Sequence, residues 1–300
     1  MTSRILAFAG SKQSGKTTSS NFLHGYQLRC NGAVSGFDIT TEGKLVIKSI
    51  NIDDNGEEVE SSGFLDVSRD DEEFAQWAAY SMWPYVKSYS FAKPLKEIST
   101  ELFALSRENV FGDNILKNSK TFFRWEDMPS VITDKALLKN KDIKKLLDSG
   151  TLKYHEPGRM THREFLQFVG TDVFRKIYDD VWHEKLTRDI SIEQPLLAII
   201  DDCRFPNEVE AIQRASGKVI YLTRSLYEDN HSSESQLKNY SNFDKVIDNN
   251  NLTIHETNIK IMQTFEEWGW LGEEITPDKL QHKSPQQEPE IVGGIHKIKG

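Results

Sequence analysis

The stretch from residue 4 to residue 18, RILAFAGSKQSGKTT, decides the fold of this 300-residue chain. Its first half is a compact apolar run that predicts a strand, and the sequence behind it, TTSSNFLHGYQL, predicts a helix. The residues from Gly10 to Thr17 satisfy the pattern G-x-x-x-x-G-K-[ST] without a mismatch. A strand, a glycine-rich loop and a helix in this order predict a phosphate-binding loop.

Such a loop binds phosphate because its backbone N–H groups converge on phosphate oxygens and the helix N-terminus adds partial positive charge. We expect Lys16 to reach the β- and γ-phosphates of ATP and the Thr17 hydroxyl to bind Mg²⁺. The other expected nucleotide contacts are Gly10, Lys12, Ser14, Gly15 and Thr18. The alternative is a chance glycine-rich turn after a strand. Because kinases, GTPases and ATPase switches share the motif, the loop by itself does not choose the reaction.

The rest of the chain alternates between strand-like and helix-like segments. VKSYSFA, PLLAIID, GKVIYLTR and FDKVIDNN read as strands, and helical patterns separate or follow them. PLLAIID is the near-continuous apolar run typical of a strand buried on both faces of a parallel sheet. The pattern predicts a doubly wound α/β fold, a three-layer P-loop NTPase sandwich around a parallel central sheet.

Other segments interrupt this alternation. Residues 36–66 predict an inserted β-hairpin around Asn55-Gly56, a favoured two-residue turn. The residues around this turn resemble the start of a calcium-binding loop, and the hairpin turn explains them better. Residues 109–155 predict mobile helices and loops over a cleft, and residues 161–190 predict a long helix. We expect a kinase domain over 1–271 with a helical acceptor and lid region over 93–190. The polar residues 272–300 predict a disordered tail.

Composition excludes several classes of protein. A net charge of −9 argues against a protein that coats DNA or RNA. No stretch approaches the ~20 apolar residues that span a bilayer, and the two cysteines, Cys30 and Cys203, do not make a disulfide framework. We expect a cytoplasmic protein whose partner is a small nucleotide, and the sequence leaves a homodimer open.

Acidic and basic side chains are expected beside the phosphate loop. Asp201 ends the strand PLLAIID and Asp202 follows it, and we expect one of the two to hold the metal, with Asp201 as our choice; the alternative is a solvated acidic pair that caps the next helix. Arginine suits phosphate because its planar fork binds in a bidentate manner. The basic candidates are Lys96, Arg124, Arg163, Arg204 and Arg224, although a residue of this kind, taken singly, is more often a solvated surface charge. Trp182 fits either a base-stacking role or a buried core position.

Three blocks resemble the bacteriophage deoxynucleoside monophosphate kinases, a P-loop kinase family: SFAKPLKEI, REFLQFVGTDVF with Trp182 downstream, and IIDDCRFPNEVEAIQRASGKVIYLTR. The resemblance implies an acceptor nucleotide site. By matched position it implies roles for Lys96, Arg163, Gly170, Thr171, Trp182, Asp202, Arg204 and Glu208, with Arg124 a weaker match. The hairpin and tail look like additions to the family pattern, and Gln13 stands where a basic residue can occur.

The resulting hypothesis is transfer of the γ-phosphate of ATP to a deoxynucleoside monophosphate (dNMP), with Mg²⁺, in dNTP precursor synthesis. Lys16, Arg204 and Asp202 are the expected catalytic residues, and the reaction belongs in the host cytoplasm if the protein is viral. The acceptor phosphate is already ionised at neutral pH, so a general base adds little. The alternatives are a nucleotide-binding switch or ATPase without an acceptor, and a P-loop kinase for another small molecule.

Overall fold

The computed structural model describes residues 3–53, 55–69, 71–225, 237, 239–271 and 296–297. The chain forms two compact units. Unit 1 contains residues 1–91 and 183–300, and unit 2 contains residues 92–182. Unit 2 is therefore inserted into the sequence of unit 1.

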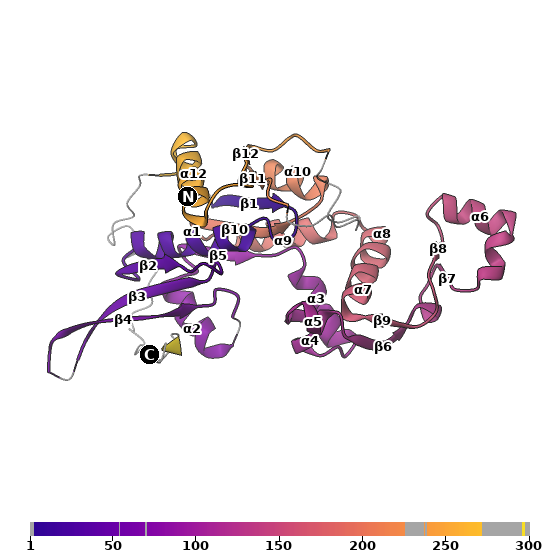
Figure 1. Cartoon of the computed structure of the whole chain (residues 1–300), viewed down its shortest axis with the longest axis horizontal. Coiled ribbons are helices and arrows are strands. Elements are labelled where there is room, and N and C mark those ends of the chain that lie inside the picture. Colours follow the sequence, from indigo (N-terminus) through magenta and orange to yellow (C-terminus); the bar gives the residue numbers. More distant parts are fainter. Residues whose placement is uncertain are drawn as a thin grey trace. The chain divides into compact units, whose positions relative to one another are not determined.

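The centre of unit 1 is a five-stranded sheet in which all neighbouring strands are parallel, in the order β12-β11-β1-β10-β5 (Figure 1). The strands are β1 (Arg4–Gly10), β5 (Val86–Tyr89), β10 (Leu197–Cys203), β11 (Lys218–Leu222) and β12 (Lys245–Ile247). β1 lies in the middle, because Arg4 pairs with Leu197 on one side and Leu6 with Lys218 on the other. The predicted parallel α/β fold is confirmed, and the loop after β1 leaves from the centre of the sheet's carboxyl edge.

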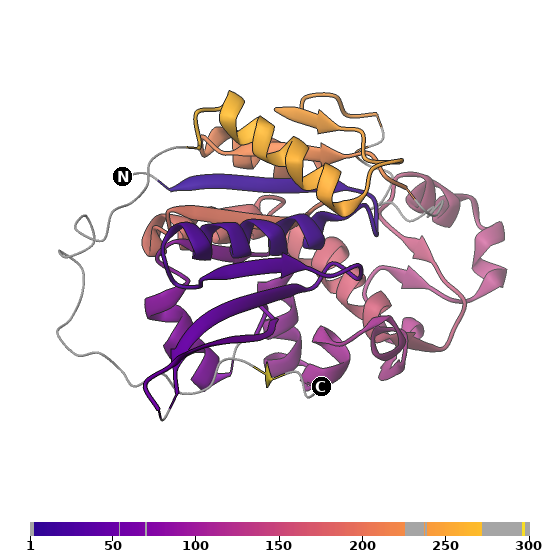
Figure 2. The same cartoon turned by 60° about the vertical axis from the view of Figure 1, so that its left-hand side comes forward.

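Helices cover this sheet because its strands are apolar on both faces. Figure 2 shows α1 (Lys16–Cys30) and α12 (Ile254–Glu267) together on one face, and the two helices contact each other. Leu6 and Phe8 of β1 are fully buried there with Leu23 of α1. Burying each such side chain stabilises the fold by about 1.5–3 kcal/mol. Helix α10 (Pro206–Arg214) contacts β1 and β11. The remaining helices of this unit are α2 (Glu72–Ser81) and most of α9 (Val181–Glu193).

Unit 1 also contains an antiparallel sheet. Its strands are β2 (Gly36–Ile39), β3 (Leu45–Ile52), β4 (Glu58–Leu65) and β13 (His296–Lys297), in the order β13-β4-β3-β2. In the turn between β3 and β4, the Asp53 carboxylate accepts hydrogen bonds from the backbone N–H groups of Asn55 and Glu57 (2.9 Å each), and Gly56 has φ 78°. Segment 36–66 thus has three strands where the sequence predicts two. Of the predicted tail 272–300, all but His296 and Lys297 lies outside the described residues.

Unit 2 is built from short elements around a small aromatic core. Val110, Met160, Phe165, Phe168 and Val169 are buried together. Its helices are α3 (Lys93–Leu102), α4 (Arg107–Phe111), α5 (Asn114–Lys117), η1 (Trp125–Asp127), η2 (Lys135–Lys139), α6 (Lys141–Asp148), α7 (His162–Gln167), η3 (Phe168–Phe174) and α8 (Arg175–Ile177). Its strands are β6 (Lys120–Arg124) with β9 (Arg159–Thr161), and β7 (Val131–Ile132) with β8 (Lys153–Tyr154).

The long helix predicted for residues 161–190 is interrupted in the structure. α7 continues into η3, a π-helical segment, and then into α8, which ends at Ile177. Tyr178 is extended, with φ −155° and ψ 110°, so α9 starts separately at Val181. Ile177 is consequently 77% exposed, where the predicted apolar stripe would bury it. π-Helical turns are rare and occur frequently at functional sites.

Candidate active site

The loop between β1 and α1 has the backbone shape that its motif predicts. Gly10 (φ 143°), Gln13 (φ 62°) and Gly15 (φ 103°) all have positive φ. A Cβ atom on Gly10 would lie 2.5 Å from the Leu222 carbonyl oxygen, so no larger residue fits there. Gln13 adopts a conformation that is uncommon for a residue with a side chain. The loop therefore exists as a formed structure between strand and helix.

The Lys16 side chain is folded back onto this loop. Its ammonium group donates to the carbonyl oxygens of Gly10 (2.8 Å) and Ser11 (2.7 Å), and the residue is buried. Carbonyl oxygens stabilise the buried charge but carry no negative charge themselves. A phosphate oxygen would bind the same ammonium group more strongly, because hydrogen bonds between ionised groups are about twice as strong as neutral ones.

Two further loop residues are placed differently. Lys12 is exposed, as expected for a group that reaches a ligand from the surface. Thr18 faces the antiparallel sheet, because a Cβ atom on Gly43 would lie 2.2 Å from the Thr18 hydroxyl oxygen. Thr18 thus packs against the chain itself.

The sequence analysis did not single out Asn249, a buried residue that holds the phosphate loop. Its side-chain amide donates to the Ser14 carbonyl oxygen (2.8 Å), and its side-chain oxygen accepts from the Arg224 N–H (2.9 Å). Arg224 in turn donates from Nη2 to the Asn249 carbonyl oxygen (2.8 Å) and also binds the Leu252 carbonyl. The guanidinium of Arg224, a predicted phosphate candidate, therefore supports the segment after β12. The only sequence signal for Asn249 was its position just after a strand.

Thr17 and Asp201 form the pair of oxygen groups expected of a Mg²⁺ site. The Thr17 hydroxyl donates to Asp201 Oδ2 at 2.8 Å, which brings the start of α1 to the end of β10. Burial, with the charge of Asp202 as a smaller cause, raises the pKa of Asp201. Hydroxyl and carboxylate oxygens suit Mg²⁺, which usually takes one or two protein ligands together with phosphate and water. The described residues contain no cluster of three or more His, Cys, Asp or Glu placed to hold a metal. This donor set fits an ion brought with a nucleotide.

Asp202 faces a different part of unit 1. Its carboxylate accepts from the Ser90 hydroxyl (2.6 Å) and the Phe91 N–H (3.1 Å), which lie just after β5. These contacts fix the start of the segment SFAKPLKEI. Asp202 is thus placed to orient the chain that leads to Lys96.

Glu208 closes the N-terminus of α10. The carboxylate is buried and accepts from the backbone N–H groups of Arg204 (2.8 Å) and Phe205 (3.1 Å). Such a contact satisfies donors that the first turn of a helix leaves open. The structure therefore gives Glu208 a capping role and places Arg204 two residues before the helix.

The predicted acceptor residues in unit 2 fall into two groups. Gly170 and Trp182 are buried, and the indole N–H donates to the Gly170 carbonyl oxygen at 3.3 Å. This geometry favours packing over base stacking for Trp182. Thr171 is exposed, and the Lys96 ammonium group lies 5.1 Å from the centre of the Phe111 ring.

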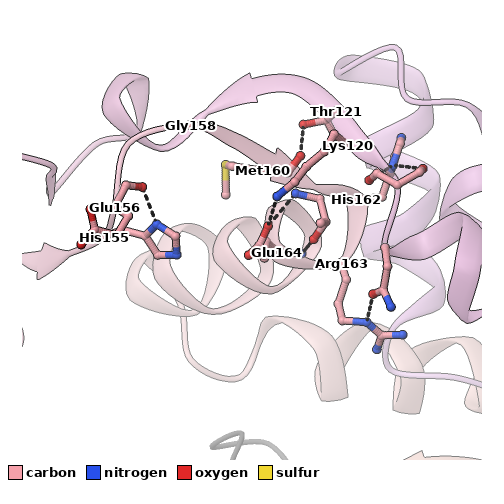
Figure 3. Close-up of polar contacts among 12 residues, drawn as sticks. Lys120, Thr121, His155, Glu156, Gly158, Met160, His162, Arg163 and Glu164 are labelled. Carbon is pink, nitrogen blue, oxygen red and sulfur yellow. Dashed lines mark hydrogen bonds and ion pairs between the residues drawn. The ribbon is translucent and has the colours of Figure 1, made fainter.

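The two predicted arginines of unit 2 have unlike partners. Arg163 Nε donates to Asn118 Oδ1 (3.1 Å) and Nη2 donates to Asn114 Oδ1 (2.8 Å), and Figure 3 shows its side chain extended from α7. Arg124 Nε instead pairs with Glu126 Oε1 at 2.5 Å. Glu126 also accepts from the Gly158 N–H (2.8 Å). This hydrogen bond from Gly158 is the main cause that lowers the pKa of Glu126, and the backbone N–H of Glu126 and the side chain of Arg124 are smaller causes. Arg124 therefore faces a full negative charge.

Comparison with known proteins identifies the family. The profile of the family described as Deoxynucleotide monophosphate kinase matches residues 99–261, more than half of the chain. The chain belongs to this family. A relative from Acanthamoeba polyphaga mimivirus, whose name also designates a deoxynucleotide monophosphate kinase, is 29% identical over 181 residues, which cover 56% of this chain and 76% of the relative. The Deoxynucleoside-5'-monophosphate kinase of Escherichia phage T5 is 26% identical over 157 residues, which cover 43% of this chain and 60% of the relative.

Membership of this kinase family makes the protein a phosphotransferase and confirms the predicted resemblance. The matched range begins at Ser99 and does not include the phosphate loop. Loop geometry and family membership are therefore independent observations. No helix in the described part of the chain has the length and apolar character needed to cross a membrane.

Proposed function

We propose that this deoxynucleotide monophosphate kinase transfers the γ-phosphate of ATP, as its magnesium complex, to a dNMP and so produces ADP and a deoxynucleoside diphosphate. The observation that carries this proposal is the formed phosphate loop, with Lys16 and the Thr17–Asp201 pair, in a chain of this kinase family. Because both relatives are viral, we place the reaction in dNTP precursor synthesis in the cytoplasm of an infected cell.

The donor nucleotide is assigned to unit 1. The backbone of the loop binds the phosphates, and Lys16 exchanges its carbonyl partners for β- and γ-phosphate oxygens. Thr17 and Asp201 would hold Mg²⁺, which would supply positive charge beside the phosphate oxygens. Lys16 stabilises the charge that develops on these oxygens, and no protein nucleophile is needed.

The acceptor nucleotide is assigned to basic and positioning residues. Arg163 supplies the phosphate contact with the clearest geometry, since it is held at two of its nitrogen atoms. Arg124 keeps a weaker assignment because Glu126 neutralises it. Arg204 stabilises the transferring phosphate. Asp202 orients the segment after β5 and is not required as a base. The remaining proposed acceptor contacts are Lys96, Gly170 and Thr171.

A coupled assay of ADP formation with Mg-ATP and a panel of dNMPs tests this function. We expect at least one dNMP to raise ADP formation far above the rate with ATP alone. Lys16→Ala should lower the dNMP-dependent rate about 100- to 1,000-fold, the usual cost of removing one donor to transition-state charge. Lys260→Ala, an exposed lysine of α12, is the matched control and should keep the full rate.

The alternative of a nucleotide switch without an acceptor makes the opposite prediction. ADP release would then be slow and independent of every monophosphate in the panel. That result, with an intact fold, would contradict the proposed function. A rate that rises only with a non-nucleotide acceptor would favour a kinase for another small molecule.

A further inference from the structure

Arg163 is held by two neutral amides. Its Nε and Nη2 donate to Asn118 Oδ1 (3.1 Å) and Asn114 Oδ1 (2.8 Å), and both asparagines belong to or directly follow α5. Among the described residues, no carboxylate pairs with Arg163. Arginine has only donors, so the amide oxygens must face the guanidinium whatever the assignment of the amide nitrogens. In both asparagines the amide oxygen, and not the amide nitrogen, is therefore the atom that faces Arg163.

The support for these amides is rigid. Asp113 caps α5 by accepting from the Leu116 N–H (2.9 Å), and the Asn118 N–H donates to the Asn114 carbonyl oxygen (3.1 Å). Residues four apart lie on one face of a helix, so both asparagines present their side chains together. The His162 N–H, next to Arg163, donates to the Ser119 carbonyl oxygen at 3.1 Å. The end of α5 and the start of α7 are thus joined at His162 as well as at Arg163.

Amide partners hold an arginine without neutralising it. A carboxylate in the same place would orient the guanidinium equally well but would cancel its attraction for an anion. Arg124 shows that arrangement, with Glu126 at 2.5 Å. Arg124 and Arg163 are therefore both held by side-chain oxygens, but only the partner of Arg124 carries a negative charge. Arg163 combines a side chain that is held at two nitrogen atoms with a charge that no carboxylate neutralises, and its Nη1 has no partner among the described residues.

We propose that Asn114 and Asn118 are positioning residues that hold Arg163 ready to bind the phosphate of the dNMP. The inference rests on the proposed function. It explains how one basic residue of the acceptor site is held so that it selects a phosphate group. If Arg163 is held in place before the ligand binds, less conformational entropy is lost when its long side chain is ordered on the ligand. The asparagines hold the guanidinium of Arg163 in place and leave its positive charge unneutralised. Both features are needed for binding the phosphate of the dNMP.

The decisive variants are Asn118→Asp and Asn114→Asp, made separately. Each keeps the shape of the side chain and its bond to Arg163, and each adds the negative charge that the native site lacks. We expect the KM for dNMP to rise about tenfold, which is the effect of weakening one charge-assisted contact, while the KM for ATP changes less than about twofold. Thermal stability should be unchanged or higher, because an ion pair replaces a neutral contact.

The matched control is Asn140→Asp. Asn140 lies in unit 2 and caps α6 by accepting from the Asp142 N–H (2.8 Å), a task that aspartate performs equally well. The substitution makes the same change in net charge without touching an arginine. It should leave the KM values for both substrates at the wild-type level.

A purely structural role for the asparagines predicts a different result. If they only joined α5 to α7, both aspartate variants would keep the native KM for dNMP, and that outcome would overturn the inference. Equal loss of ATP and dNMP binding in a folded variant would overturn it as well. Failure of the proposed function is separately visible, since the wild-type enzyme would then form no ADP in response to any dNMP.

A binding measurement gives a second readout. Titration calorimetry should show that Asn118→Asp weakens binding of the dNMP and leaves binding of the corresponding deoxynucleoside, which has no phosphate, unchanged. A substitution that merely distorted the site would weaken both ligands. Arg163→Lys keeps the charge but loses the planar fork, so we expect it to weaken dNMP binding by a similar factor.

Discussion

The two units hold their charged groups in opposite ways. In unit 1, Lys16 is buried and its ammonium group binds carbonyl oxygens of the loop that precedes it by a few residues. In unit 2, Arg163 is partly exposed and binds Asn114 and Asn118, which lie 49 and 45 positions away in the chain. The contacts of Lys16 are therefore local in the sequence, whereas those of Arg163 join distant segments.

This difference has an energetic consequence. Buried polar groups are costly unless they are satisfied, and the phosphate loop is held by the buried Asn249 and by the more exposed Thr17–Asp201 pair. Exposed contacts such as those of Arg163 contribute little to stability. Substitutions of the buried residues that hold the phosphate loop should therefore affect folding and catalysis together, and substitutions around Arg163 should affect binding alone.

Apart from Lys16→Ala, the largest expected effect comes from Asp201→Asn. The change removes the negative charge but keeps an oxygen for the Thr17 hydroxyl, so the loop should remain formed. We expect kcat to fall on the order of 100-fold and the Mg²⁺ concentration for half-maximal rate to rise, because ligand substitutions and losses of supporting groups commonly cost 10- to 100-fold. Magnesium titration of the dNMP-dependent rate measures both quantities.

Asp202→Asn separates the two neighbouring carboxylates. It disturbs the contacts with Ser90 and Phe91 and should lower kcat while the magnesium titration keeps its native midpoint. A shift of that midpoint in Asp202→Asn, without a shift in Asp201→Asn, would transfer the metal site to Asp202.

The comparison also explains which features the sequence could predict. The strand-loop-helix step and the apolar run PLLAIID predicted the parallel sheet, because each depends on residues adjacent in the chain. Residues 109–155 gave no clear periodicity, since their elements are only two to eight residues long. The segment was predicted to form helices and loops, and it contains short helices together with strands that the sequence did not predict.

Site residues followed the same division. Lys16 and Thr17 could be found from a motif, whereas Asn114, Asn118 and Asn249 could not, because an asparagine gains its role only from a partner brought near by folding. Tyr178 gave no signal that it would end a helix, and the apolar stripe through Ile177 concealed the break. Glu208 and Arg224 have types that suit ligand binding, but backbone groups of this chain are their partners.

The next largest expected effect is a decrease in the free energy of unfolding at low pH, and its origin is a buried histidine in unit 1. His24 of α1 is fully buried between the Ser20 carbonyl oxygen (2.9 Å) and the Ser88 hydroxyl (3.2 Å). Burial lowers the pKa of His24 from 6.5 to about 4. Between these values the unfolded chain binds a proton that the folded chain excludes, so stability falls as the pH decreases. From pH 7 to pH 5 the loss is about 2 kcal/mol.

Urea unfolding of wild type and His24→Asn at pH 7 and pH 5 measures this loss. The variant should be less stable at pH 7, but its stability should decrease between the two pH values by about 2 kcal/mol less than that of wild type, since other titrating groups cancel in the comparison. Equal decreases in the two proteins would show that His24 accepts a proton within the fold.

The smallest effect tests whether Trp182 packs or binds. Trp182→Phe keeps an aromatic ring against Phe174 but leaves the Gly170 carbonyl oxygen in η3 without its side-chain donor. We expect the free energy of unfolding to fall by about 1 kcal/mol and the KM for dNMP to stay within about twofold of the native value. Trp125→Phe, which removes an indole stacked on His155, is the matched control in the same unit. A tenfold rise in the KM for dNMP in Trp182→Phe at unchanged stability would mean that the indole contacts the nucleotide, and unit 2 would then hold a buried ligand contact like those of unit 1.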